Sequence, residues 1–215
     1  MYEEVAGWYA AGMDDEMAKP MYAEGLPDFL TRVLATTSTE AAEDAPIVDV
    51  GCGSADALAV LARLDRVPPL VGLEPSAAMR AAAAAKIEAL PPAAASRITI
   101  RDGSTATELE SGSCRGIICF FVVHHVAATD LPALFAAWSK ALVAGGQIYL
   151  AAWEGEGVVD YGGKYDIDAV LHPLSALTAG LGAAGLVVDT DATHTETDPD
   201  FGMSIAIIKA HKPGL

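Results

Sequence analysis

The chain contains few cysteines and few basic residues, and each shortage excludes a class of protein. Its three cysteines are odd in number and show no C-x-x-C spacing, so the sequence predicts free thiols rather than a disulfide framework or a zinc site. Only 13 Lys and Arg oppose 29 Asp and Glu, which gives a formal net charge of −16 without any basic cluster. This balance disfavours nucleic acids and anionic membranes as partners.

Long apolar stretches are also absent from the sequence. Although 52% of the residues are hydrophobic, no run approaches the roughly 20 residues that a membrane-spanning helix needs. The N-terminus shows no signal-peptide pattern of basic, apolar and small residues. We therefore expect a cytoplasmic protein in which residues 1–215 form one domain with a large apolar core.

Apolar runs and helical patterns alternate from residue 47 onward, which is typical of a parallel sheet covered by helices on both faces. A helical cap over residues 1–45, with helices at 2–11 and 26–36, precedes the first run. Residues 173–215 are expected to form a helix and a β-hairpin, because the last loop is too short for a crossover helix. The individual elements expected are strands at 47–50, 70–74, 98–101, 116–123, 147–152, 186–192 and 204–210, and helices at 55–65, 76–89, 104–110, 130–143 and 174–184.

The most informative stretch begins with a short apolar run that ends in Asp49 and continues directly into a glycine turn and a helical pattern. Gly51 and Gly53 lack a Cβ, so a ligand can lie directly against the backbone of this turn. The next apolar run ends in Glu74, where an acid in a doubly wound sheet accepts hydrogen bonds from ribose hydroxyls. Two acids at the same sheet edge predict a nucleoside-binding site.

The residue at position 56 decides which nucleoside this site favours. A dinucleotide fingerprint, G-x-G-x-x-G, would place its third glycine there, but the chain has Asp56, a poor neighbour for a pyrophosphate. Asp49 instead suits a ligand that carries a positive charge. An NAD(P)-dependent oxidoreductase on a Rossmann sheet stays open as an alternative that Asp56 weakens.

At this point the residues resemble the class I S-adenosylmethionine-dependent methyltransferases, whose first motif has the form (D/E)-x-G-x-G-x-G. Asp49, Gly51 and Gly53 match this motif, and Ala55 replaces its last glycine. The resemblance implies a Rossmann-like, seven-stranded, mostly parallel sheet with a reversed last strand and helices on both faces. It also implies S-adenosyl-L-methionine as the cofactor, S-adenosyl-L-homocysteine as the product, and a cofactor-binding core over residues 46–153.

The same resemblance assigns individual cofactor contacts. Glu74 would hold the ribose, and Met79 would pack against the adenine. Asp102 and the backbone of Gly103 would bind the adenine edge, and carbonyls near Phe120 would meet the methionine ammonium. Plainer roles stay open, with Glu74 as a helix-capping partner, Met79 as a core residue and Asp102 as a turn residue. The complete expected cofactor-binding set is Asp49, Gly51, Cys52, Gly53, Glu74, Met79, Asp102, Gly103 and Phe120.

Two adjacent histidines are the catalytic candidates. Methyl transfer from a sulfonium is an in-line displacement in which the protein mainly positions the acceptor, and a base is needed only where the acceptor must lose a proton. His124 and His125 close the expected fourth strand at the ligand edge, where either can take that proton. Alternatively, they cap the strand or pack under the following helix. Adjacent histidines rarely chelate one ion, so no metal site is predicted.

Residues 154–172 follow the expected fifth strand with glycine, aromatic and acidic residues, a composition that suits a lid over the acceptor. No large second domain is present to enclose a macromolecule, so we expect a small-molecule methyl acceptor, neutral or cationic. A methyltransferase-like subunit that binds without catalysis stays open, and neither the oligomeric state nor the acceptor atom is predicted. Further candidates for the acceptor wall are Trp8, Tyr9, Trp153, Tyr165, Asp166, Asp168, His172, His194 and Glu196.

Overall fold

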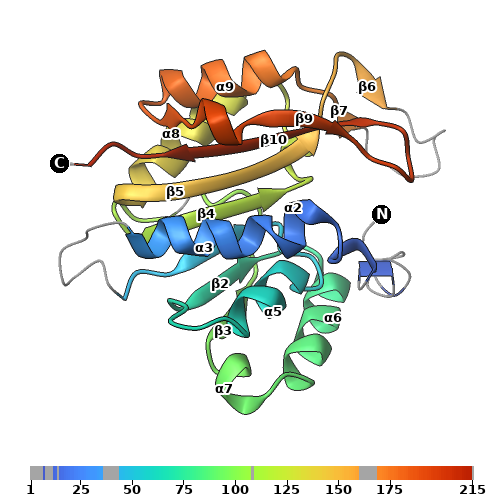
Figure 1. Cartoon of the computed structure of the whole chain (residues 1–215), viewed down its shortest axis with the longest axis vertical. Helices are drawn as coiled ribbons and strands as arrows, with labels where there is room; N and C mark the ends of the chain where they lie inside the picture. Colours follow the sequence, from blue (N-terminus) through green and yellow to red (C-terminus); the bar gives the residue numbers. More distant parts are fainter. Residues whose placement is uncertain are drawn as a thin grey trace.

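The computed structural model describes residues 7, 12–13, 15–35, 44–107, 109–159 and 169–214. Its main sheet has the strand order β3-β2-β1-β4-β5-β10-β8, and β9 is a further partner of β10 (Figure 1). The strands are β1 (Ile47–Val50), β2 (Leu70–Leu73), β3 (Ile98–Arg101), β4 (Cys114–Phe120), β5 (Leu142–Trp153), β8 (Val187–Val188), β9 (His194–Thr197) and β10 (Ser204–His211).

The sheet is mostly parallel, as the sequence predicts. Strands β1 to β5 run parallel to one another, and β10 is antiparallel to β5, with Ile205 opposite Trp153. The chain order reverses between β1 and β4, and in open α/β sheets a ligand crevice lies beyond the carboxyl ends of the strands at such a switch point. The fold class is therefore confirmed, and its topology marks the ends of β1 and β4 as the site.

Helices cover both faces of this sheet, because neighbouring residues on each strand point to opposite sides. The helices are α2 (Pro20–Ala23), α3 (Gly25–Ala35), α5 (Asp56–Ala62), α6 (Ala77–Glu88), α7 (Pro92–Ala95), α8 (Leu131–Ala141) and α9 (Leu174–Ala183). In β1, Ile47 packs into the core beneath α2, α3 and α5, whereas Val48 and Val50 pack into the core beneath α8 and α9. Figure 1 shows α3 crossing in front of the central strands.

Three polar contacts dock the N-terminal helices onto the sheet. The hydroxyl of Tyr149 on β5 donates to the carbonyl of Met21 in α2 at 2.6 Å. Nη2 of the buried Arg115 on β4 donates to the carbonyl of Val33 near the end of α3 at 3.2 Å. Lys209 of β10 pairs with Asp28 of α3 at 2.6 Å. These contacts position α2 beside the carboxyl ends of the central strands.

Several expected elements differ in the structure. The expected helix at 104–110 does not form among the described residues. Ala106 has a positive φ of 59°, and the indole N–H of Trp138 donates a hydrogen bond to the carbonyl of Thr105. The expected strand at 186–192 is shortened to β8, and the rest of that range contains the short 3₁₀ helix η2 (Thr190–Ala192). The strand β9 follows after that range. Both β8 and β9 pair antiparallel with β10.

The segment expected to form a lid is partly described. Val158–Val159 (β6) and Ala169–Val170 (β7) pair antiparallel as a small separate ribbon. Three of the expected contacts in this segment, Tyr165, Asp166 and Asp168, lie outside the described residues, as do Trp8 and Tyr9 and most of the expected helix at 2–11. The three cysteines are free, as expected, and all three are buried. Within the described ranges, no helix has both the length and the apolar character needed to cross a bilayer.

Candidate functional site

The turn after β1 has a backbone that favours glycine. Gly51 and Gly53 have φ values of +68° and +53°, in the left-handed region where a Cβ is strained. A Cβ on Gly51 would also overlap the side chain of Val122. The N–H of Cys52 donates to the carbonyl of Leu73 at 3.0 Å, which ties the turn to the end of β2. Ala55, at the last glycine position of the motif, adopts the same left-handed region with φ of +64°.

Glu74 connects this turn to the next helix. The side chain is 6% exposed, and its Oε2 accepts the N–H of Gly53 at 3.0 Å. Its Oε1 accepts the N–H of Ser76 at 2.8 Å, while the Ser76 hydroxyl caps α6 by accepting the N–H of Met79. The helix-capping role of Glu74 is therefore present, and the ribose role is compatible with it because each carboxylate oxygen can accept more than one hydrogen bond.

Asp49 lies beneath the turn and is 4% exposed. Burial raises the pKa of its carboxyl well above the ordinary value, and the nearby carboxylates of Glu74 and Asp56 raise it further. A buried acid in this environment gains from a cation, which both neutralises its charge and relieves the repulsion. The site therefore favours a positively charged ligand group.

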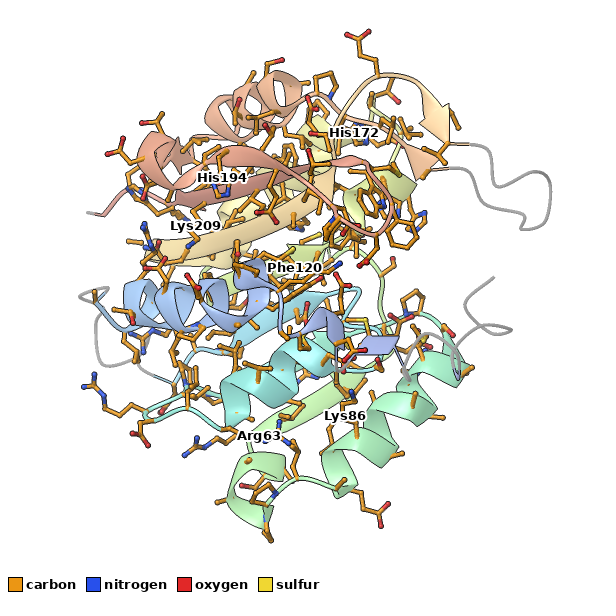
Figure 2. The ribbon with its side chains drawn as sticks, turned by 45° about the vertical axis from the view of Figure 1, so that its right-hand side comes forward. Arg63, Lys86, Phe120, His172, His194 and Lys209 are labelled. Atoms are coloured by element: carbon orange, nitrogen blue, oxygen red, sulfur yellow. The ribbon has the colours of Figure 1, made fainter. Side chains whose placement is uncertain are left out.

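Asp56 stands at the start of α5, where a dinucleotide-binding turn would hold a pyrophosphate. It accepts a hydrogen bond from the Ser54 hydroxyl and forms an ion pair with Lys86, which reaches across from α6 (Figure 2). Asp56 thus links α5 to α6 and places a carboxylate at the N-terminal end of α5. This arrangement disfavours a pyrophosphate at the turn.

A pocket opens over the glycine turn between the strand ends and the N-terminal segment. It brings together five of the nine expected cofactor residues, namely Asp49, Gly51, Cys52, Gly53 and Phe120. The other described lining residues are Met13, Met17, Tyr22, Asp56, Ala57 and Phe121. The sequence analysis did not predict the two N-terminal methionines or Tyr22 as pocket residues. The one local sequence signal for the methionines is the i, i+4 spacing of Met13 and Met17, which places them on one face of a helix.

The three residues expected at the adenine do not line this pocket. Met79 is buried within α6, which is also what its plainer role as a core residue predicts. The side chain of Asp102, after β3, is 76% exposed and lies 3.4 Å from Arg80 in an ion pair. Gly103 follows it in the chain. Arg80 also donates to the carbonyls of Glu74 and Pro75. The adenine contacts remain predictions.

The candidate histidines lie on a short 3₁₀ helix, η1 (Val123–His125), directly after β4. His124 is 3% exposed, and burial, together with its neighbours His125 and His172, lowers the pKa of its imidazole to about 3. Burial also lowers the pKa of His125. Both rings are therefore neutral at pH 7, with centroids 4.1 Å apart. His125, the more exposed of the two, is the better placed to accept a proton.

His172 is a third histidine in this cluster. Its Nε2 hydrogen-bonds to the carbonyls of Val123 and Val126, both at 3.1 Å. His172 comes from the segment after β7 (Figure 2). Its hydrogen bonds therefore attach that segment to η1 and to the residue that follows η1. Across the described part of the chain, no group of three or more His, Cys, Asp or Glu side chains is arranged to hold a metal ion.

His194 and Glu196 occupy a different position from the one expected. Both were expected in a hairpin loop at the ligand edge, but they belong to β9, where His194 lies opposite Ile207 of β10. The side chain of His194 is exposed, that of Glu196 is half-buried, and the two lie 3.9 Å apart. They differ from the expectation because β10 has a free edge after β8 ends, and backbone pairing converts the expected loop into a strand.

A family model described as a methyltransferase domain matches residues 47–146, from the start of β1 into β5. The matched segment, a little under half of the chain, is similar to a methyltransferase domain. The match covers the glycine turn, Glu74 and the two histidines, so the residues that carry the resemblance lie within it. A search of curated proteins finds no match to the chain.

Solved structures with the same fold confirm this architecture. A putative methyltransferase of Haloferax volcanii, in complex with the Trm112 methyltransferase activator, matches at a TM-score of 0.71 and 17% identity, covering 99% of this chain and 97% of that one. An S-adenosylmethionine-dependent methyltransferase of Mesorhizobium loti matches at 0.64 and 18%, covering 91% and 99%. The geranyl diphosphate C-methyltransferase of Streptomyces coelicolor, with S-adenosyl-L-homocysteine bound, matches at 0.63 and 16%, covering 89% and 79%.

Proposed function

We propose that this methyltransferase domain transfers a methyl group from S-adenosyl-L-methionine to a small-molecule acceptor by in-line displacement. One observation carries the proposal: the buried Asp49 lies beside a glycine turn whose Gly53 amide is bound by Glu74. A buried acid with a raised pKa favours a cationic ligand, and the donor brings both a sulfonium and an ammonium group. The methyltransferase family match supports the same cofactor.

The residues present fit this cofactor. Asp49 and carbonyls near Phe120 would hold the ammonium, Glu74 the ribose, and Gly51 and Gly53 allow close backbone approach. Met79, Asp102 and Gly103 remain our proposed adenine contacts, and Cys52 contributes its backbone to the turn. When bound, the cofactor supplies a methyl carbon that the sulfonium already activates.

The protein's own contribution is mainly the placement of the acceptor. Holding two reactants at attack distance is worth up to ~7–11 kcal/mol in favourable systems. Where the acceptor must lose a proton, His125 is neutral and can take it, because burial lowers its pKa. His124 is more deeply buried, and we assign it a supporting place beneath His125 rather than contact with the acceptor.

We infer a division of labour along the chain. Residues 46–153 hold the cofactor, and residues 173–215 complete the sheet. Residues 1–45 form an N-terminal helical cap, and residues 154–172 are the proposed lid over the acceptor. The pocket contacts of Met13, Met17 and Tyr22 support this role for the N-terminal part. A small acceptor is in keeping with the Streptomyces coelicolor neighbour, which is a geranyl diphosphate C-methyltransferase.

Calorimetric titration of the protein with S-adenosyl-L-homocysteine and with NADH tests the cofactor. Binding of the first and not of the second is expected, and the reverse result would favour the oxidoreductase. Formation of S-adenosyl-L-homocysteine from the donor with a panel of small acceptors then tests catalysis. Binding without turnover across the panel would favour a non-catalytic subunit, and methylation confined to added protein or RNA would exclude a small acceptor.

A further inference from the structure

Three aromatic side chains from separate segments form a row beyond the carboxyl ends of β4 and β5. The ring of Phe121 lies 4.8 Å from that of Trp153, at an interplanar angle of 46°. Trp153 lies 5.9 Å from Phe201, edge to face, at 80°. Phe121 also lines the pocket over Asp49. The row therefore leads from the pocket to the surface at the β9–β10 turn, on the side of the molecule where β5 ends (Figure 1).

The outer member of the row is exposed, and its backbone is held in place. Phe201 is 67% exposed, the most exposed of the large apolar side chains that the structure describes. Its backbone N–H donates to Oδ1 of Asp198 at 2.8 Å, and the same buried carboxylate accepts from Lys19 at 3.0 Å. The backbone of the turn that carries Phe201 is thus anchored to the N-terminal segment.

The inner members have features that the fold itself does not use. Phe121 has a φ of +55°, a left-handed conformation that is strained for a residue with a Cβ and recurs at ligand sites. The indole N–H of the half-buried Trp153 donates to no acceptor among the described residues and is not one of their buried unpaired polar atoms, so this donor is open to a ligand. A bound ligand would use both the ring faces and this donor.

The charges around the row limit what can bind there. Lys19 pairs with three carboxylates, those of Glu16, Asp198 and Asp200, so this corner has an excess of negative charge. Among the described residues that line the adjoining pocket, Asp56 is already paired with Lys86, so Asp49 is the acid that faces a ligand there. An anionic ligand would be repelled, whereas a cationic ring would gain from both the acids and the aromatic faces.

We propose that Phe121, Trp153 and Phe201 form the acceptor subsite, and that the acceptor is a small aromatic-ring compound, neutral or cationic, without a phosphate group. This inference rests on the proposed function, because it takes the adjoining pocket as the place of the methyl donor. The ring of the acceptor packs against Trp153 and Phe201, and Trp153 Nε1 donates to one of its polar atoms.

Two probes that share a ring but differ in charge test this subsite. Binding of 2-phenylethylamine and of phenyl phosphate is measured by ligand-detected NMR on protein saturated with S-adenosyl-L-homocysteine. We expect the amine to bind at least about tenfold more tightly than the phosphate, since one unfavourable charge contact at a partly buried site is worth about 1.4 kcal/mol. Equal or tighter binding of phenyl phosphate would overturn the proposal.

Substitutions at Phe201 give the second test, because its exposed side chain can be replaced without opening the core. Phe201→Ala should weaken 2-phenylethylamine binding about tenfold, and Phe201→Tyr should retain it. Val187→Ala, at an exposed apolar residue of β8, is the matched control and should change nothing. Unchanged binding in Phe201→Ala would overturn the subsite. If the wild-type protein fails to bind S-adenosyl-L-homocysteine, the proposed function fails instead, and the two failures are thus distinguished.

Discussion

The carboxylate of Glu74 accepts the backbone N–H of Gly53 at 3.0 Å, so the acid after β2 and the turn after β1 form one unit. The second oxygen is engaged as well, by the N–H of Ser76 at the start of α6. Two fixed N–H donors hold the carboxylate in one orientation before any ligand arrives. A ligand that binds this acid therefore meets a preorganised site rather than a mobile side chain.

Glu74→Gln should weaken S-adenosyl-L-homocysteine binding by about 10- to 100-fold, since a hydrogen bond to a charged group is worth roughly 1.5–3 kcal/mol. The amide keeps one acceptor oxygen but faces one of the two N–H donors with its own NH₂ group. Calorimetry measures the affinity, and Glu88→Gln at the exposed end of α6 is the matched control. An unchanged affinity in Glu74→Gln would exclude contact between this acid and the ligand.

Gly51→Ala should abolish cofactor binding and lower Tm, because its Cβ overlaps Val122 and its φ of +68° is strained. The double variant Gly51→Ala/Val122→Ala removes the overlap but leaves the backbone strain, which costs roughly 1 kcal/mol. We expect it to recover part of the lost stability in thermal melts. Full binding by the single variant would place the ligand elsewhere.

Asp49→Asn separates stability from binding. The pKa of Asp49 is raised in the folded protein, so the protonated form is the favoured one, and stability is lost as pH rises from the ordinary value of 3.8 through the raised pKa. The uncharged Asn should therefore raise Tm of the free protein at pH 7 and abolish binding of a cationic ligand. The difference in Tm should vanish below pH 3.8, and a variant less stable than wild type at pH 7 would contradict this.

His125→Ala should lower kcat by about 10²- to 10⁴-fold for an acceptor that must lose a proton. It should have little effect on an acceptor that attacks without proton loss, which serves as the internal control. Because burial lowers the pKa of His125, the wild-type rate should stay level as pH falls below 6.5 and decline only at the lowered pKa. A decline centred at or above 6.5 would assign the proton to another group.

His172→Ala removes the hydrogen bonds to the carbonyls of Val123 and Val126 and should cost about 1–3 kcal/mol of stability. As a positioning residue, it should affect kcat more than the acceptor KM, because η1 carries His125. His172→Gln keeps an N–H donor and should restore part of kcat. If His172→Gln recovers Tm but loses as much kcat as His172→Ala, the positioning role is contradicted.

Local sequence determined the core of the site. A buried apolar run, a turn of glycines at positive φ and a helical pattern are each encoded within a few residues, so the sequence alone predicts the turn after Asp49 that contains Gly51 and Gly53. The sequence also predicts that Glu74 lies beside this turn, because the end of the next strand must reach the same edge of a parallel sheet. The role of these residues toward a cofactor stays a prediction. The number and spacing of the cysteines predict the free thiols, and the short last loop predicts the antiparallel β10.

Tertiary contacts decided the rest. The indole of Trp138 takes the carbonyl of Thr105 and prevents the expected helix at 104–110, and the free edge of β10 draws His194 into a strand. The row of Phe121, Trp153 and Phe201 joins segments up to 80 residues apart, which no local pattern encodes. Backbone periodicity is a property of neighbours in the chain, whereas the wall of a pocket depends on which distant segments the packed sheet brings together.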